Sequence, residues 1–193
     1  MERPLSVLVP LVLLLIRRGT TTDVCHDKIC PQYKVIETNQ DFEVRLYDAT
    51  NWITATIEGK GLNDLKAAHS KLEDYCNGLR RAGYEIPSNA WPVLISSTEG
   101  SGLSLSWFIP PGTRMPEDTH PLVKQQSRAE GTVYVRVFRE FPSFESVEKY
   151  TDVLHAALDK AGKDYDRRMF SGAFYESYFS TVHNNEVFIS AAP

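Results

Sequence analysis

Two side chains of this sequence, His69 and Lys66, are of types that could act together on a ligand. An imidazole nitrogen can ligate a transition metal, and a lysine ammonium group can pair with a carboxylate of a ligand. The two residues lie three positions apart, so on a helix their side chains are neighbours. Together they would suit a ligand that carries both a metal ion and anionic groups.

The segment that must position both residues is 63–82, whose apolar side chains recur three and four positions apart, as on one face of an α-helix. Asn63 is a suitable N-cap. The helix ends either at Asn77-Gly78 or one turn later at Gly83. His69 lies inside the apolar stripe, which consists of Leu65, Ala68, Leu72, Tyr75, Cys76 and Leu79.

Each of these residues also has an ordinary structural explanation. A lone histidine in an apolar stripe is more often a buried, hydrogen-bonded residue than a ligand, and a lone lysine is more often solvated. Leu65 and Leu72 pack in the core unless a groove stays open beside them. The sequence leaves both interpretations open. The weaker histidine candidates, which lie near the start of the chain, in loops or off an apolar stripe, are His26, His120, His155 and His183.

The rest of the chain predicts a sheet and a second helix, which lies between Ser143, its N-cap, and Gly162. Two strands, a helix and two strands recur in halves of about residues 31–110 and 122–190, which indicates an internal duplication. Neither half can bury its sheet face alone, so we expect one α+β domain over residues 31–190 with a mostly antiparallel, barrel-like sheet. The expected strands are 33–36, 42–47, 52–57, 93–96, 103–109, 122–127, 132–138, 169–175 and 186–190.

Bulk properties and missing motifs argue against several functions. The 193 residues carry a formal net charge of −4, with a pI near 5.7, which argues against a nucleic-acid-binding surface. The motifs GxxxxGK[ST], GxGxxG, GxSxG and HExxH do not occur, so common phosphate, dinucleotide, serine-hydrolase and zinc-protease sites have no support. No spacing indicates an acid–base or nucleophile–base pair. We therefore expect a protein that is not an enzyme.

Residues 1–19 are typical of a secretory signal peptide, with a basic residue ahead of an apolar run of twelve residues. That run is shorter than the ~20 residues that cross a bilayer as a helix, so we expect no membrane span. A retained anchor is the alternative. Export favours a disulfide among the three cysteines. Our first expectation is Cys25–Cys30, with Cys76 as a buried hydrophobic residue, in a secreted, extracellular protein.

Short segments spread along the chain resemble the SOUL/heme-binding protein family. They run in order from Pro31 to Ser190: PQYKVIE, FEVRLY, WPVLIS, LSWFIP, GTVYVRVF, AFYESYF and HNNEVFIS. The resemblance implies a distorted antiparallel eight-stranded β-barrel with two flanking α-helices and pseudo-twofold symmetry. It also implies reversible, non-covalent binding of heme or another porphyrin in an apolar groove beside the first helix.

The resemblance gives the residues of that helix specific roles. Leu65 and Leu72 would supply apolar surface, Lys66 would pair with a heme carboxylate, and His69 would ligate the iron. Binding residues of some family members are replaced here: the matching positions are Leu46, Asp74 and Ser180.

We therefore expect a secreted carrier of heme or porphyrin. The alternative is a module that binds another apolar or cationic small molecule without heme.

Overall fold

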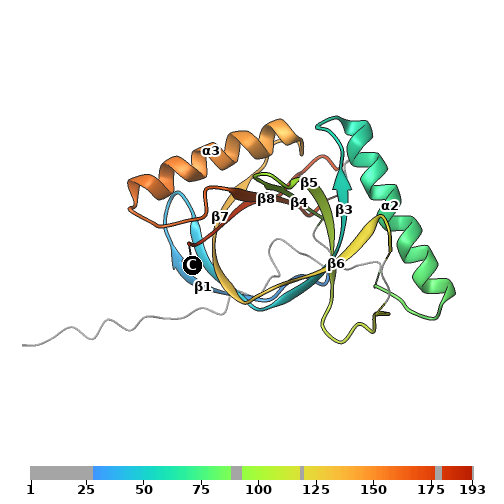
Figure 1. The fold of residues 1–193 in the computed structure, drawn as a ribbon. Helices are drawn as coiled ribbons and strands as arrows, with labels where there is room; N and C mark the ends of the chain where they lie inside the picture. Colours follow the sequence, from blue (N-terminus) through green and yellow to red (C-terminus); the bar gives the residue numbers. More distant parts are fainter. Residues whose placement is uncertain (1–27, 88–92, 118–119, 177–179, 193) are drawn as a thin grey trace, which may run out of the picture.

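The computed structural model describes residues 28–87, 93–117, 120–176 and 180–192. Within these ranges the chain forms nine strands and two helices (Figure 1). Every predicted strand and helix is present, with ends that differ by at most a few residues. The elements are β1 (Tyr33–Thr38), β2 (Glu43–Tyr47), β3 (Thr50–Ile57), α2 (Leu62–Arg81), β4 (Val93–Thr98), β5 (Gly102–Ile109), β6 (Val123–Arg128), β7 (Gly131–Phe138), α3 (Phe144–Lys160), β8 (Met169–Phe174) and β9 (Asn185–Ser190).

The nine strands form one antiparallel sheet in the order β1-β2-β7-β9-β8-β4-β5-β3-β6. The edge strands β1 and β6 do not pair with each other in the described ranges, so the sheet is open. The eight-stranded barrel that the resemblance implied is therefore corrected in two respects: the sheet has nine strands, as the sequence pattern predicted, and it does not close. Figure 1 shows the sheet strongly curled, as expected from the twist of adjacent strands.

Apart from β1, the strand order is symmetric about the β8–β4 pair. The elements β2, β3, α2, β4 and β5 follow one another in the first half, and β6, β7, α3, β8 and β9 repeat that sequence in the second. The first strand of each half pairs with the second strand of the other half, β2 with β7 and β6 with β3. This exchange of strands ties the two halves into one sheet.

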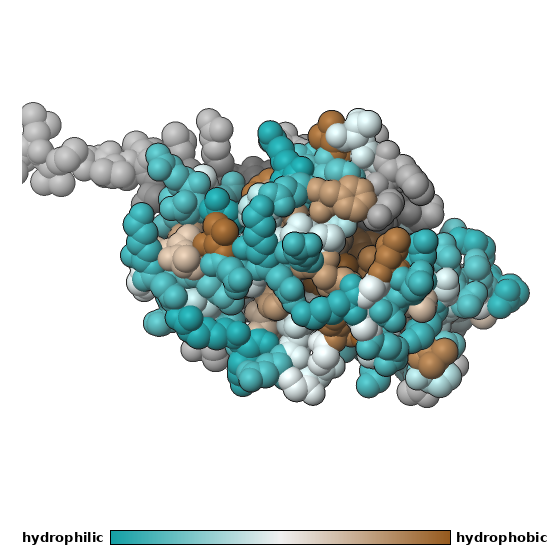
Figure 2. All heavy atoms as spheres, turned by 90° about the horizontal axis from the view of Figure 1, so that it is seen from above, coloured by the Kyte–Doolittle hydropathy of each residue, from teal (hydrophilic) through white to brown (hydrophobic). Residues whose placement is uncertain are grey.

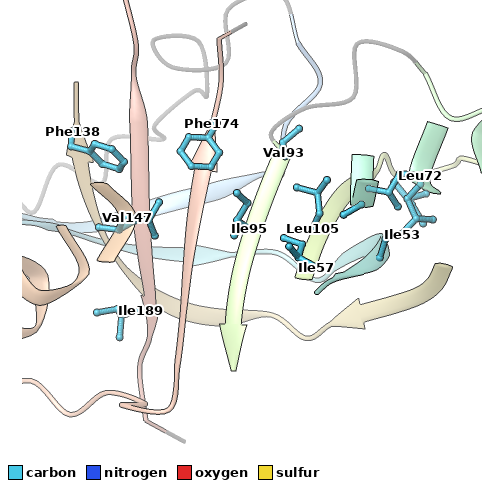
Figure 3. Close-up of a cluster of buried hydrophobic side chains, with 14 of the residues drawn as sticks. Ile53, Ile57, Leu72, Val93, Ile95, Leu105, Phe138, Val147, Phe174 and Ile189 are labelled. Atoms are coloured by element: carbon cyan, nitrogen blue, oxygen red, sulfur yellow. The ribbon is translucent and has the colours of Figure 1, made fainter. Parts of the chain in front are cut away.

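The sheet presents different side chains on its two faces, because successive residues of a strand point to opposite sides. In β3, Ile53 lies in the larger hydrophobic cluster together with Leu72 of α2. The adjacent Trp52 belongs to a second cluster that contains mainly aromatic and small side chains. Figure 3 shows the larger cluster extending along the sheet from Ile53 and Leu72 to Phe138 and Ile189. The helices thus cover one face, and the other face lines the concave side of the curl.

Helix α2 begins slightly earlier than its sequence suggests. Its N-cap is Gly61 rather than the expected Asn63, and the Gly61 N–H donates to Asp64 Oδ2 at 3.0 Å. At the other end, the alternative at Gly83 is confirmed: its φ is 84°, and its N–H donates to the Arg80 carbonyl oxygen at 3.1 Å. A glycine in this left-handed conformation is a common end of a helix.

Helix α3 begins at the predicted cap, where Ser143 Oγ accepts a hydrogen bond from the Ser146 N–H at 3.0 Å. It packs on β7, β8 and β9. Gly172 of β8 permits a close approach, because a Cβ at this position would lie 2.6 Å from Cγ2 of Val147 on α3. The absence of a side chain at Gly172 therefore sets how closely α3 lies on the sheet.

The signal peptide predicted at residues 1–19 and the expected disulfide partner Cys25 lie outside the described residues. Cys30 is disulfide-bonded, and Cys76 is a free cysteine. Burial raises the pKa of the Cys76 thiol to about 11, so this thiol is protonated at neutral pH. In the part of the chain that the structure describes, neither helix is both long and apolar enough to cross a bilayer.

The close approach of α3 predicts that Gly172→Ala will lower the free energy of unfolding by about 1–3 kcal/mol, the usual cost of overpacking. Val147 is buried, and its β-branched side chain has few rotamers with which to make room. Chemical denaturation followed by circular dichroism measures the change.

The matched control is Gly78→Ala in α2, where an added Cβ meets no atom within 4 Å. This substitution is expected to stabilise the chain by roughly 0.5–1 kcal/mol, because alanine favours a helix interior over glycine. Equal stability of Gly172→Ala and the unaltered chain would contradict the close packing of α3 on β8.

Candidate functional site

A groove lies above the centre of the sheet, on the face that carries the helices. Helix α2 packs on β3, β5 and β6, and α3 packs on β7, β8 and β9. Within the described ranges neither helix packs on β4, which lies between β8 and β5. The space left there has a volume of about 510 Å³, within the range of small-molecule sites. Figure 2 views the molecule from this side, and apolar side chains gather near its centre.

The groove is lined mainly by apolar side chains from both helices and the strands beneath them. Val93 and Ile95 come from the uncovered strand β4, Leu65 comes from α2, and Phe144 comes from the start of α3. The complete lining is Lys60, Leu62, Leu65, His69, Val93, Ile95, Leu105, Phe141, Pro142, Ser143, Phe144, Phe174 and Glu176.

His69 lines this groove, and 45% of its side chain is exposed. Its ring packs edge-on against Trp107 of β5, with the ring centroids 5.2 Å apart. Its Nδ1 lies 3.6 Å from a carboxylate oxygen of Glu73, one turn along α2. These two neighbours hold the imidazole while part of it stays open to the groove, so the side chain is not a buried core residue.

The other three predicted site residues separate in the structure. Leu65 lines the groove and is half-buried. Leu72 is fully buried in the hydrophobic core and is not part of the groove lining. Lys66 is exposed and also lies outside the lining. The apolar stripe of α2 therefore divides between the core and the groove, and its roles as a binding surface stay predictions.

Lys60, which the sequence analysis did not select, provides the lysine of the groove. It lies between Gly59 and Gly61, just before α2, and its ammonium group forms an ion pair with Glu148 of α3. Its side chain is 64% exposed, so the ammonium group lies near solvent at the groove. The sequence analysis missed this lysine because it precedes the helical stripe. The available signal was its position between two glycines, which are common where the backbone approaches a neighbouring group closely.

The segment that follows β8 adds polar groups next to the groove. The Glu176 carboxylate accepts hydrogen bonds from the backbone N–H and the side-chain amide of Asn184, at 2.7 and 2.8 Å. His183 is buried, and its Nδ1 has no hydrogen-bond partner among the described residues. Its ring packs edge-on against Phe141, with the centroids 5.5 Å apart. His183, which the sequence analysis placed in a loop, thus packs against Phe141, a side chain that lines the groove.

The arrangement at His69 suits a metal that arrives with other ligands of its own. In the described ranges no group of three or more His, Cys, Asp and Glu side chains could hold a bare metal ion. A porphyrin supplies four nitrogen ligands and needs only axial donors from the protein. Histidines that bind metals commonly donate a hydrogen bond from their second ring nitrogen to a carboxylate, and Glu73 places a carboxylate 3.6 Å from Nδ1, just beyond hydrogen-bond distance.

Comparisons with known proteins place this chain in a family. A family model described as SOUL heme-binding protein matches residues 28–190. The human protein named Heme-binding protein 2 is 27% identical over 158 residues, which covers 77% of this chain and 77% of that protein. Its mouse counterpart is 27% identical over 159 residues, with the same coverage of 77% of each chain.

A solved structure described as a hydrolase from Listeria innocua is similar in fold, with a TM-score of 0.53 and 13% identity. The match covers 81% of this chain and 94% of that one. At this identity the likeness concerns the fold alone. The family match, by contrast, spans nearly the whole described chain and confirms the resemblance inferred from the sequence segments. This chain belongs to the SOUL heme-binding protein family.

Proposed function

We propose that this chain is a secreted, non-enzymatic carrier that binds heme or another porphyrin reversibly and without covalent attachment, in the groove above β4. Its family and the names of its human and mouse relatives support heme as the ligand. The observation that carries the proposal is the half-exposed His69, held by Trp107 and Glu73 at the edge of an apolar groove.

The walls of the groove would bind the porphyrin mainly by burying apolar surface. Phe144 and Phe174 offer aromatic faces to a flat ring system, while Leu65 and Ile95 offer aliphatic surface. Each Å² of apolar area removed from water contributes roughly 25 cal/mol. This term does not depend on the metal, so the groove would also hold a porphyrin without iron.

His69 would provide the axial nitrogen. When bound, heme supplies an iron with an axial position open to a nitrogen donor. The imidazole has its Nδ1 3.6 Å from the Glu73 carboxylate, so Nε2 would be the nitrogen that ligates the iron. A shortening of the Nδ1–carboxylate separation to hydrogen-bond distance would fix the tautomer of the ring.

Lys60 would pair with a heme carboxylate in place of the Lys66 that the sequence suggested. Lys60 lines the groove, whereas Lys66 lies outside the lining. Its ion pair with Glu148 is exposed at both ends, and exposed pairs contribute only about 0–1 kcal/mol. Exchange of Glu148 for a ligand carboxylate would therefore cost little.

Export is supported by cysteine chemistry. Cys30 is disulfide-bonded, and disulfides form and persist mainly in oxidising compartments such as the secretory pathway.

His69→Ala is predicted to weaken binding of hemin by at least about tenfold, equivalent to ~1.4 kcal/mol, and to move the Soret band. The loss follows from removal of the axial nitrogen. Titration of hemin followed by absorbance measures both quantities. His155→Ala on α3, which does not line the groove, serves as the control and is expected to leave both unchanged. An unchanged Soret band and affinity in His69→Ala would exclude His69 as the ligand.

The two lysines make a second, matched test. Lys60→Met is predicted to weaken hemin binding several-fold, because a charge-assisted hydrogen bond to a carboxylate is lost, whereas Lys66→Met is predicted to have no effect. Fluorescence titration with iron-free protoporphyrin separates this interaction from iron ligation. A loss confined to Lys66→Met would return the role to the residue that the sequence suggested. A chain that shows no Soret change with hemin at all would favour the alternative of a different small-molecule ligand.

A further inference from the structure

The concave face of the sheet carries a second cavity, with a volume of about 450 Å³. It shares no lining residue with the groove above β4. Leu94 lines the cavity, whereas its neighbours Val93 and Ile95 line the groove, and Tyr175 and Phe174 divide in the same way. Because successive residues of a strand point to opposite faces, the two spaces lie on opposite sides of the sheet.

Aromatic rings form a large part of this cavity. Tyr33 and Tyr47 have ring centroids 5.0 Å apart, and Phe188 lies edge-on to Tyr47 with centroids 6.1 Å apart. Trp52, Phe170 and Tyr175 also line the cavity. The guanidinium group of Arg45 lies over the Tyr33 ring, 4.4 Å from its centroid, so a further flat ring would pack mainly against the other rings of the lining. The cavity is rich in aromatic side chains, and it is large enough for a ligand of small-molecule size.

Arg128, at the end of edge strand β6, brings a guanidinium group into this cavity. One of its terminal nitrogens donates to Ser96 Oγ at 3.0 Å, and the group lies 5.5 Å from the centroid of the Trp52 ring. Burial lowers the pKa of Arg128, and no neighbouring carboxylate offsets this effect. Within the described residues no carboxylate lies within ion-pair distance of it. Its charge thus has polar and aromatic neighbours but no counter-ion.

Arg45, which is buried on the same side of the sheet as the half-buried Arg128, differs in this respect. Arg45 pairs with Glu186, which is fully buried, and with Glu43, each at 2.8 Å. Glu186 also accepts a hydrogen bond from the Tyr175 hydroxyl. The buried carboxylate is therefore already matched by a cation, and Arg128 provides the unmatched charge of the cavity.

We propose that this inner cavity binds a flat aromatic monocarboxylate, with its ring among the aromatic side chains and its carboxylate on Arg128. A guanidinium group presents parallel N–H donors that fit a carboxylate. Asp48 and Glu130 also line the cavity, but both are exposed. Their negative charges repel a phosphate dianion more than an anion of single charge, and Arg128 disfavours a cation.

The test compares three ligands of nearly equal shape on the unaltered protein: 1-naphthoate, the neutral 1-naphthalenemethanol and the cationic 1-naphthylmethylammonium. Isothermal titration calorimetry is expected to show 1-naphthoate binding at least about tenfold more tightly than the alcohol, as for a hydrogen bond to a charged group. The ammonium ligand is expected to bind most weakly. Equal binding of the three, or a preference for the ammonium ligand, would overturn the proposal without any need for a variant.

Arg128→Met is predicted to remove the preference, so that naphthoate and the alcohol bind alike. The matched control is Arg114→Met, which removes an exposed arginine that lies over the Tyr84 ring outside the cavity and is expected to keep the preference. Circular dichroism checks that both variants fold. Retention of the preference in a folded Arg128→Met protein would contradict the assigned role of this residue.

A hemin titration in the presence of saturating 1-naphthoate separates the cavity from the groove. Unchanged hemin affinity, together with unchanged naphthoate binding by His69→Ala, is the expected result. Displacement of naphthoate by hemin would instead assign the cavity to the porphyrin and overturn the proposal of a separate ligand. The test of the inner cavity does not depend on whether hemin binds in the groove, because the three naphthalene ligands are compared without hemin.

Discussion

The structure depends on a constraint of packing: two helices cover the outer face of the sheet, and strand β4 lies between them. The symmetric strand order places β8 and β4 at the centre, and each helix packs on the strands of one side. Helix α2 packs on β3, β5 and β6, and α3 packs on β7, β8 and β9, so among the described residues β4 is the strand between them that neither helix contacts. The groove lies over β4 for this reason.

Successive side chains of a strand point to opposite faces of the sheet, and this alternation makes the two faces chemically different. The outer face carries aliphatic side chains together with phenylalanine and tyrosine rings that pack against the helices, and His69 lies at the margin of the space that remains. The inner face holds aromatic rings and the buried pair of Arg45 and Glu186. Removal of one partner from such a pair usually costs about 3–5 kcal/mol, so this pair links β2 to β9, the two strands that flank β7. Arg128, near the open edge of the sheet, has no such partner.

Much of this fold could be predicted from the sequence, because strand alternation and helical periodicity are local signals. The division of the α2 stripe between core and groove could not be predicted. Leu65 and Leu72 have the same side chain and belong to the same stripe, and only the position of β4 decides which one lines the groove. Lys60 was missed because it lies before the helix, although it meets the groove that Lys66 does not. The role of Arg128 depends on strands far apart in the chain, and so does the open edge of the sheet. The nine strands themselves were predicted from their local alternation.

The account rests on a porphyrin lying over β4 on the helix-bearing face. The most direct measurement is methyl NMR of the chain titrated with gallium protoporphyrin, whose ring current shifts nearby methyl resonances. We expect the methyl groups of Val93 and Ile95 to shift, while those of Leu94, which point to the other face, stay unchanged. Shifts of Leu94 and Val133 without shifts of Val93 and Ile95 would place the porphyrin in the inner cavity and contradict the account.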